Sequence, residues 1–398
     1  MKLSSHVVTL LISLGLILFL PIELTHGTDL WSSEPPGQTP IWRLDLHPLG
    51  FANDQEKRGE YWLTRFERPV AVTQTGEIAV IFVNFRMTSH GYVPGTSSMH
   101  FMIVNRDSGK VTYSKAWPVA DRSEIPSIIV TPEDHLLLYS DFSGALALYS
   151  TKLELTSSAS FEKQGEIGSN WTSSDGRYFF YEVKDGRHYD LTMVDSESLK
   201  SVESWTLDSP IAAASDRYFA RWEDIKDQYR RSLYVRSTDT EWKEIYRDTG
   251  CNEPFGFAQF LAQDVLLVRS CGKVTILNAD GKILFAISVP PKHEIGLRGP
   301  FGASSNGKRF ATSIAELKRQ PWWYGDPGYD RIHPTLVVYD TAGSHPVSSL
   351  TLNEKDEWPF GFALSADGSL VALLRGGYLE LYRLTGESLN EAGKAKSR

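Results

Sequence analysis

Short apolar runs broken by turn-forming residues are the dominant pattern in this chain. The clearest example is residues 358–384, WPFGFALSADGSLVALLRGGYLELYRL. Its apolar runs, Gly361–Leu364, Leu370–Leu374 and Tyr378–Leu384, are separated by Asp367-Gly368 and by Gly376-Gly377. Asp-Gly and Gly-Gly supply the positive-φ positions that tight hairpins require. The pattern therefore predicts a three-stranded antiparallel meander, which can bury its faces only against neighbouring copies.

Such copies recur along the chain. Six of them have a proline just before the first strand, namely Pro69, Pro126, Pro210, Pro254, Pro300 and Pro359. A seventh begins at Gly168-Ser169-Asn170-Trp171, inside the long interval between the second and third of these prolines. Four strands and about 40–45 residues per unit is the spacing of a β-propeller. The sequence predicts an all-β fold of seven four-stranded antiparallel blades.

The two ends of the repeat region predict how the ring closes. The last unit has no fourth strand, because the chain becomes polar from 385 to 398. At the other end, Ile41–Leu46 alternates apolar and polar residues and belongs to no unit of its own. We expect this N-terminal strand to complete the last blade, so that no sheet edge stays unpaired. The propeller then spans residues 41–384, after a flexible lead-in at 28–40 and before a polar tail at 385–398.

Over residues 41–384 the chain resembles a secreted seven-bladed β-propeller of the broad WD40-like and YVTN-like group. The resemblance rests on the repeated Pro-Phe-Gly segments at 254, 300 and 359 and on the hairpin turns that follow them. It departs from true WD40 proteins because no blade carries their Gly-His and Trp-Asp pair. The resemblance implies the ring, and the missing pair argues against the cytoplasmic-type scaffold subclass.

The N-terminal segment has the features of a secretory signal peptide. Lys2 is followed by an apolar core at Val7–Ile22 and by small residues near Gly27, after which we expect cleavage. An uncleaved signal anchor is the alternative, because the apolar core approaches the length of a membrane span. Pro21 and Glu23 favour cleavage. We expect residues 1–27 to be removed and the protein to be secreted or periplasmic, with no membrane span afterwards.

Charge restricts the partners. The formal net charge of −8 and the lack of a long basic run argue against nucleic-acid binding, because the phosphate backbone would be repelled. We expect a monomer that binds a protein, a peptide or a glycan.

The two cysteines, Cys251 and Cys271, suit an oxidising compartment. They flank a predicted hairpin, and antiparallel pairing centred on residue 261 would place them opposite one another. We expect a disulfide that stabilises the fold by about 3 kcal/mol. A metal pair or a catalytic thiol is the alternative.

Long insertions mark one face of the ring. In a propeller, the connections that enter the innermost strand and those that join the second and third strands emerge on the same face, which we call the entry face. The insertions Arg86–Ser98, Glu223–Arg231 and Glu316–Pro334 all fall on it. The third is rich in aromatic and polar residues suited to stacking on a sugar or peptide, unless the aromatic rings fold back onto the propeller. The candidate ligand-binding residues are Trp322, Trp323, Tyr324, Tyr329, Asp330, Arg331, His333, Tyr92 and Arg298.

An acidic residue precedes the innermost strand in five of the units. These residues are Glu67, Glu124, Asp208, Glu253 and Glu357. Carboxylates converging on the channel mouth could bind a Ca²⁺-like cation or raise one carboxyl pKa for acid–base chemistry. They could equally be solvent-facing turn residues of an acidic protein. No ligand spacing specifies a calcium loop, so we expect no dedicated cofactor.

No catalytic motif is present, since the chain has no GxSxG elbow and no P-loop. A non-enzymatic extracytoplasmic binding module is the leading hypothesis. The alternatives are a propeller enzyme, such as a metal-assisted hydrolase or lyase acting at the channel mouth, and an inert structural spacer.

Overall fold

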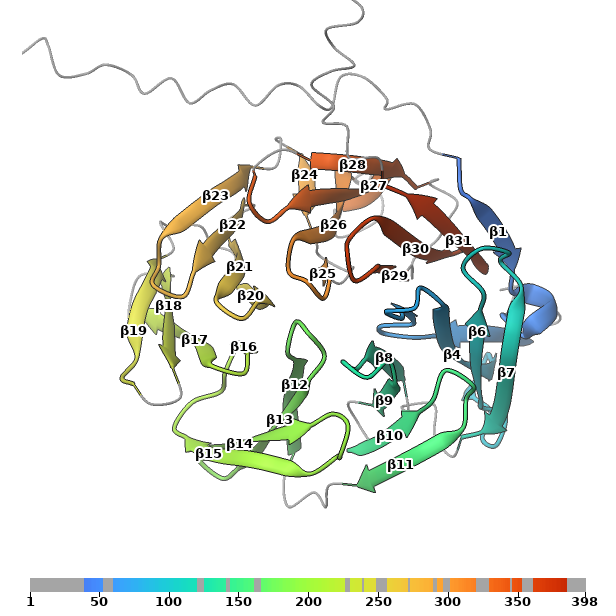
Figure 1. Ribbon diagram of the computed structural model, residues 1–398, viewed down its shortest axis with the longest axis horizontal. Coiled ribbons are helices and arrows are strands. Elements are labelled where there is room, and N and C mark those ends of the chain that lie inside the picture. Colours follow the sequence, from blue (N-terminus) through green and yellow to red (C-terminus); the bar gives the residue numbers. More distant parts are fainter. Residues whose placement is uncertain are drawn as a thin grey trace, which may run out of the picture. The chain divides into compact units, whose positions relative to one another are not determined.

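The strands of this protein form seven antiparallel sheets arranged as blades around a centre (Figure 1). The computed structural model describes residues 39–52, 60–119, 125–140, 144–160, 166–225, 230–237, 240–247, 256–270, 273–288, 292–295, 301–319, 329–343, 346–352 and 361–384. Within these ranges, regular structure is β apart from one 3₁₀ helix, His47–Leu49. None of the described residues forms a helix long and apolar enough to cross a bilayer. The chain is an all-β seven-bladed propeller, as the sequence predicts.

Blades one to four follow the chain in order. Blade one contains β2 (Glu60–Arg65), β3 (Val70–Val72), β4 (Ile78–Thr88), β5 (Gly91–Tyr92), β6 (Ser98–Val104) and β7 (Val111–Pro118). Blade two contains β8 (Pro126–Val130), β9 (Leu136–Ser140), β10 (Ala145–Tyr149) and β11 (Leu155–Ser160). Blade three contains β12 (Glu166–Thr172), β13 (Tyr178–Asp185), β14 (His188–Asp195) and β15 (Ser201–Leu207). Blade four contains β16 (Ala213–Ala214), β17 (Tyr218–Ile225), β18 (Arg230–Ser237) and β19 (Lys243–Arg247).

The last three blades complete the ring. Blade five contains β20 (Phe257–Ala262), β21 (Val265–Ser270), β22 (Lys273–Asn278) and β23 (Ile283–Ser288). Blade six contains β24 (His293–Ile295), β25 (Gly302–Ala303), β26 (Arg309–Arg319), β27 (Tyr329–Asp340) and β28 (Pro346–Thr351). Blade seven contains β29 (Gly361–Leu364), β30 (Leu370–Arg375), β31 (Tyr378–Arg383) and, from the other end of the chain, β1 (Trp42–Asp45). The predicted closure is confirmed, because β1 pairs antiparallel with β31.

Each blade is apolar on both faces, because successive side chains of a strand point to opposite sides of its sheet. In β4, Ile78, Val80 and Phe82 pack against blade seven, while Ala79 and Ile81 pack against blade two. The same division holds around the ring, so that one buried apolar cluster lies between each successive pair of blades. No blade can bury both of its faces without two neighbours.

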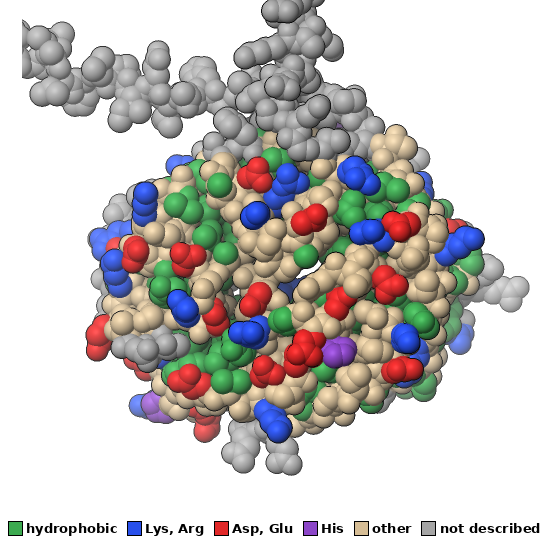
Figure 2. Space-filling view, viewed as in Figure 1, with side chains coloured by type: hydrophobic (Ala, Val, Ile, Leu, Met, Phe, Trp, Pro, Cys, Tyr) green, Lys and Arg blue, Asp and Glu red, His purple; other side chains and the backbone are tan. Residues whose placement is uncertain are grey.

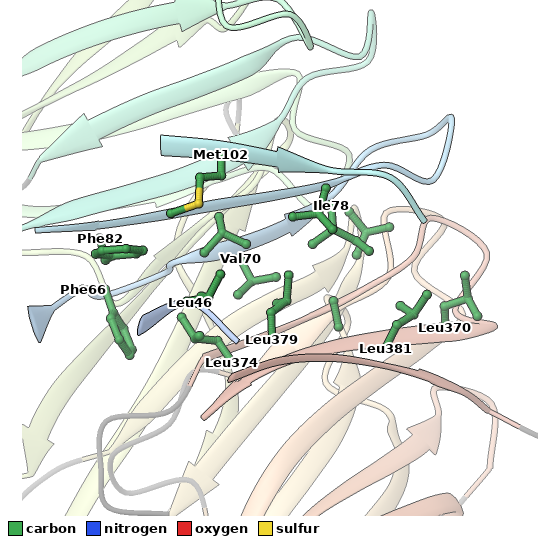
Figure 3. Packing of buried hydrophobic residues seen from close by; sticks show 14 residues of the cluster. Leu46, Phe66, Val70, Ile78, Phe82, Met102, Leu370, Leu374, Leu379 and Leu381 are labelled. Carbon is green, nitrogen blue, oxygen red and sulfur yellow. The ribbon is translucent and has the colours of Figure 1, made fainter. Parts of the chain in front are cut away.

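The cluster between blades seven and one joins the two ends of the sequence (Figure 3). Leu46, which follows β1, is fully buried among Leu374 and Leu379 of blade seven and Phe82 of blade one. At about 25 cal/mol per Å² of apolar surface, each fully buried leucine of this kind stabilises the fold by roughly 2 kcal/mol. The N-terminal strand is therefore held by packing as well as by its ladder.

The first hairpin turn of several blades is a serine-anchored Asp-Gly or Asn-Gly turn. In blade seven, the Ser365 hydroxyl donates to Asp367 Oδ1 at 2.6 Å and accepts from the Leu370 amide at 2.9 Å. Gly368 takes a φ of 71°, which only glycine adopts readily. Blade three repeats the arrangement with Ser173 and Asp175. These turns emerge opposite the entry face, on what we call the turn face.

The insertions predicted for the entry face lengthen the hairpins between second and third strands. In blade six, the β26–β27 ladder runs from the pair Arg309 and Asp340 at one end to the pair Arg319 and Tyr329 at the other. In blade four, the β17–β18 ladder extends to the pair Ile225 and Arg230. Blade one has an 11-residue β4, to which both β2 and β3 pair.

The predicted centre of the blade-five hairpin is wrong. Pairing was expected to be centred on residue 261, but Phe257 pairs with Arg269 and the turn lies at Gln263 and Asp264. Leu261 is fully buried between blades five and six and cannot belong to a polar turn. Cys251 and Cys271 lie outside the described residues. The disulfide stays a prediction that this register does not support.

A buried ionic group ties the closing strand to blade seven. Glu380 on β31 is 1% exposed, and its carboxylate accepts from Arg375 Nε at 2.9 Å and from the Tyr382 hydroxyl at 2.6 Å. Its other oxygen lies 3.4 Å from Nε of Arg43 on β1, and Arg43 also stacks over the Tyr378 ring. The negative charge of Glu380 is thus balanced by Arg43 on β1 and by Arg375 on β30, the two strands that flank β31.

Removing the Arg375 side chain should destabilise the fold more than removing the Arg43 side chain. The Arg375 side chain is 13% exposed, so Arg375→Ala leaves a buried carboxylate poorly compensated and should lower the free energy of unfolding by about 3 kcal/mol. The Arg43 side chain is 52% exposed, and Arg43→Ala should cost about 1 kcal/mol or less. Urea titrations of the two variants measure both values. Equal losses would contradict the assignment of Glu380 to a buried ionic clasp.

Candidate functional site

The innermost strands converge so closely that several residues there must be glycine. A Cβ placed on Gly361 would lie 2.2 Å from Cγ of Pro69 in the next blade. A Cβ on Gly302 would meet the Phe362 ring, and one on Gly256 would meet Trp222, each at 2.6 Å. These are the glycines of the repeated Pro-Phe-Gly segments. Their role is to let neighbouring blades approach at the centre.

The convergence stops short of filling the centre, and Figure 2 shows the ring hollowed there. A cavity of about 460 Å³ lies among the innermost strands. Most of its lining residues precede or begin β3, β16 and β20, which places it toward the entry-face end of the channel; the end of β12 and Trp222 of β17 complete the wall. Its lining comes from blades one, three, four and five: Glu67, Arg68, Ser169, Asn170, Trp171, Thr172, Pro210, Ile211, Ala212, Ala213, Ala214, Trp222, Gly256, Phe257, Ala258, Gln259 and Phe260.

A second, smaller cavity of about 180 Å³ follows towards the turn face. It is lined by later residues of the innermost strands and by first-turn residues such as Asp175. Arg68, Thr172, Gln259 and Phe260 line both cavities. These four residues therefore mark the junction between the outer and inner parts of the channel.

Aromatic side chains form much of the wall of the larger cavity. Phe257 is 38% exposed and stacks on Phe301 with ring centroids 5.1 Å apart. Trp171 is half-buried, and its indole Nε1 donates to the Ala212 carbonyl at 2.9 Å. Trp222 packs edge-to-face on Tyr246. These contacts hold the three rings in position at the cavity wall.

Polar side chains sit among these rings at fixed backbone positions. Arg68 makes a parallel bridge to Ser127 of blade two, and its carbonyl accepts from the Ile128 amide at 3.0 Å. Asn170 lies within the β12–β13 ladder, and Gln259 within the β20–β21 ladder. A wall of flat apolar rings with interspersed amide, guanidinium and hydroxyl groups suits a ligand that is itself both apolar and hydrogen-bonding.

A buried acid lies directly behind the cavity wall. Glu182 on β13 is 1% exposed, and its carboxylate accepts from the amide of the lining residue Ile211 at 2.9 Å. Burial raises the pKa of Glu182 to about 7, and the Ile211 hydrogen bond opposes part of that rise. The contact joins blade three to the segment that enters blade four.

The structure describes two of the five predicted acidic residues. Glu67 is exposed and lines the larger cavity. Asp208 accepts from Arg221 Nη1 at 3.1 Å, and its side chain is 82% exposed. Glu124, Glu253 and Glu357 lie outside the described residues. Neither Glu67 nor Asp208 belongs to a group of three potential metal ligands among the described residues.

The structure describes five of the nine predicted ligand-binding residues, and they lie in blades one and six. Tyr92 is half-buried against Phe85, and its hydroxyl lies 2.8 Å from Ser97 Oγ. His333 is exposed, with a φ of 50°. Tyr329, Asp330 and Arg331 lie in the β26–β27 ladder, and only their backbone positions are described. Trp322, Trp323, Tyr324 and Arg298 fall outside the described residues.

Sequence reasoning missed the main cavity wall. Trp171 was identified only as part of a repeat segment, and neither Phe257 nor Trp222 was singled out. A usable signal existed for Phe257, because it alternates with Ala258 and Phe260, which are buried against blade four, and so lies on the other side of β20, next to Phe301 of blade six. A group of three side chains that could hold a metal ion, Glu133, His135 and Glu197, was also missed.

Ionisation of Glu182 should make stability fall as pH rises. Its folded-state pKa of about 7 exceeds the ordinary value of 4.5, so its contribution is fully present below pH 4.5 and is lost as pH rises through 7. The loss amounts to up to roughly 3 kcal/mol. Glu182→Gln keeps an acceptor for Ile211 and cannot ionise. We expect it to match the wild type at pH 4.5 and to exceed it at pH 8 in urea titrations.

The exposed Glu203 on β15 supplies the matched control, since Glu203→Gln should follow the wild-type curve. Parallel curves for Glu182→Gln and the wild type would show that the buried acid does not set this dependence.

Comparison with protein-family models and with curated protein sequences finds no match. The chain is similar to the solved C-terminal WD40 domain of Sif2, at 10% identity and a TM-score of 0.48, covering 89% of this chain and 100% of that one. It is also similar to the β-propeller domain of Cps50 (Swd1) from Myceliophteria thermophila, at 12% identity and a TM-score of 0.47, covering 81% and 97%. Likenesses at this level carry no functional argument. The assignment of a seven-bladed propeller rests on the strand pairing itself.

Proposed function

We propose that this protein is a non-enzymatic, extracytoplasmic binding module that takes a peptide or glycan segment of its partner into the entry-face cavity. The observation that carries the proposal is the wall of Trp171, Trp222 and Phe257 interspersed with Asn170 and Gln259. Aromatic faces stack on sugar rings and apolar side chains, and amides satisfy hydroxyl or peptide groups.

Support also comes from the shape of the entry face. The long hairpins β4–β6, β17–β18 and β26–β27 emerge on the same face as the cavity mouth. A rigid ring that carries its longest connections around a hollow combines a fixed pocket with variable surroundings, which is how loop-built binding sites are arranged.

The extracytoplasmic location is proposed from the signal-like segment at residues 1–27. N-terminal sequencing of protein recovered from the periplasm or medium should begin after Gly27. Recovery of the full-length chain from the cytoplasm would contradict this part of the proposal.

Binding should depend on Phe257. Because this ring is partly exposed at the cavity wall, Phe257→Ala removes stacking surface, and the affinity for a ligand should fall by about tenfold or more. The wild type is screened on peptide and glycan arrays, and the ligands found are titrated against both proteins. Leu155→Ala on the outer strand of blade two removes an exposed apolar side chain far from the channel lining and should bind normally. Unchanged affinity of Phe257→Ala would place the site elsewhere.

A further inference from the structure

Three metal-ligating side chains meet on the turn face, between blades two and three. Glu133 and His135 belong to the turn between β8 and β9, and Glu197 belongs to the turn between β14 and β15. One ligand atom from each lies within 4.8 Å of the others. His135 Nδ1 is 2.7 Å from Glu197 Oε2. The group is separate from the cavity on the entry face, because none of its members lines either cavity.

The backbone holds this group in place from both sides. Asp134, between the two blade-two ligands, has a φ of 65°, and its carboxylate accepts from the amides of Gln74 and Thr75 in blade one. The amide of Glu133 donates to Glu197 Oε1 at 3.2 Å, so the Glu197 carboxylate is fixed on the blade-three side. The turn is thus anchored to one neighbouring blade and presents its ligands to the other.

The donor set indicates which ion would fit. One imidazole nitrogen with two carboxylates is a ligand combination of zinc and related divalent transition metals, which need three protein ligands and leave a position for water. Calcium and magnesium prefer an all-oxygen set. Tetrahedral ligands about 2.1 Å from a zinc ion lie roughly 3.4 Å apart, so a 4.8 Å grouping closes with modest side-chain rotation. Glu133 is exposed and can make that rotation.

We propose that Glu133, His135 and Glu197 bind one divalent transition-metal ion of the zinc class and so crosslink blades two and three. The ion adds a bond across an interface whose core is apolar, where Leu137 and Tyr139 pack against Phe179. Because the ligands come from two blades, the ion binds the folded ring and not the unfolded chain, and its binding raises the stability of the fold.

The competing interpretation is a simple ion pair between His135 and Glu197. The two interpretations differ in what Glu133 does. In an ion pair the Glu133 side chain has no part, whereas in a metal site its carboxylate is a ligand. Glu133→Gln is therefore the discriminating variant, since it keeps the backbone amide that donates to Glu197 and changes only an exposed side chain.

The experiment uses untagged mature protein that has been stripped with chelator and dialysed. Thermal unfolding is recorded with ZnCl₂, with CaCl₂ and without added metal, and zinc binding is measured by titration calorimetry. For the wild type we expect one zinc ion per chain and a rise in Tm of about 3 °C or more at saturating zinc, with no response to calcium. Glu133→Gln and His135→Ala should bind zinc at least tenfold more weakly and lose the Tm shift.

Matched controls come from residues outside the group. His188→Ala, at the tip of the β13–β14 hairpin, and Glu203→Gln, on β15, remove one exposed ligand-type side chain each and should keep the full zinc response. A zinc response that persists in Glu133→Gln and His135→Ala, as it would if Cys251 and Cys271 bound the ion, overturns the proposal. So does a wild type that binds no zinc. If His135→Ala fails to fold, Glu133→Gln decides the outcome.

Discussion

The structure depends on one constraint, which is that every blade carries apolar side chains on both of its faces. Ile78, Val80 and Phe82 of one strand need blade seven, and the residues between them need blade two. A row of such sheets would leave two faces exposed at its ends, and only a closed ring leaves none. Closure in turn requires a fourth strand for the last blade, which β1 supplies. The charged group at Glu380 and the buried Leu46 secure that strand.

Closure of seven blades also determines where a ligand can bind. The innermost strands approach until Gly361 and Gly302 contact the next blade with no room for a side chain. Among blades three, four and five, the larger residues Trp171, Trp222 and Phe257 line a cavity. The same convergence that stabilises the ring therefore creates the candidate site. The ionisation of Glu182 couples this site to the stability of the fold, because the buried Glu182 carboxylate accepts a hydrogen bond from the amide of a residue that lines the cavity.

Local patterns were sufficient to predict the ring. Asp-Gly turns and apolar runs indicate pairing between strands that are close in sequence. The N-terminal strand, which belongs to no unit of its own, indicates the pairing that closes the ring. The cavity and the group at His135 could not be predicted in this way, because their members lie in different blades and come together only through packing. His135 and Glu197 are 62 positions apart, and in the sequence each lies in a segment that looks like an ordinary turn. The blade-five register was misjudged because the symmetry of two cysteines was weighed above the burial of Leu261.

The ring depends on closure by β1, and amide hydrogen exchange tests this dependence most directly. The Leu46 amide donates to the Gly377 carbonyl at 2.9 Å, at the end of the closing ladder. If the ring depends on this strand, the Leu46 amide opens only with blade seven, and it should exchange as slowly as the paired amides of β30 and with the same dependence on denaturant. Exchange of Leu46 that is orders of magnitude faster, while β30 stays protected, would show that the ring persists with its closing strand released.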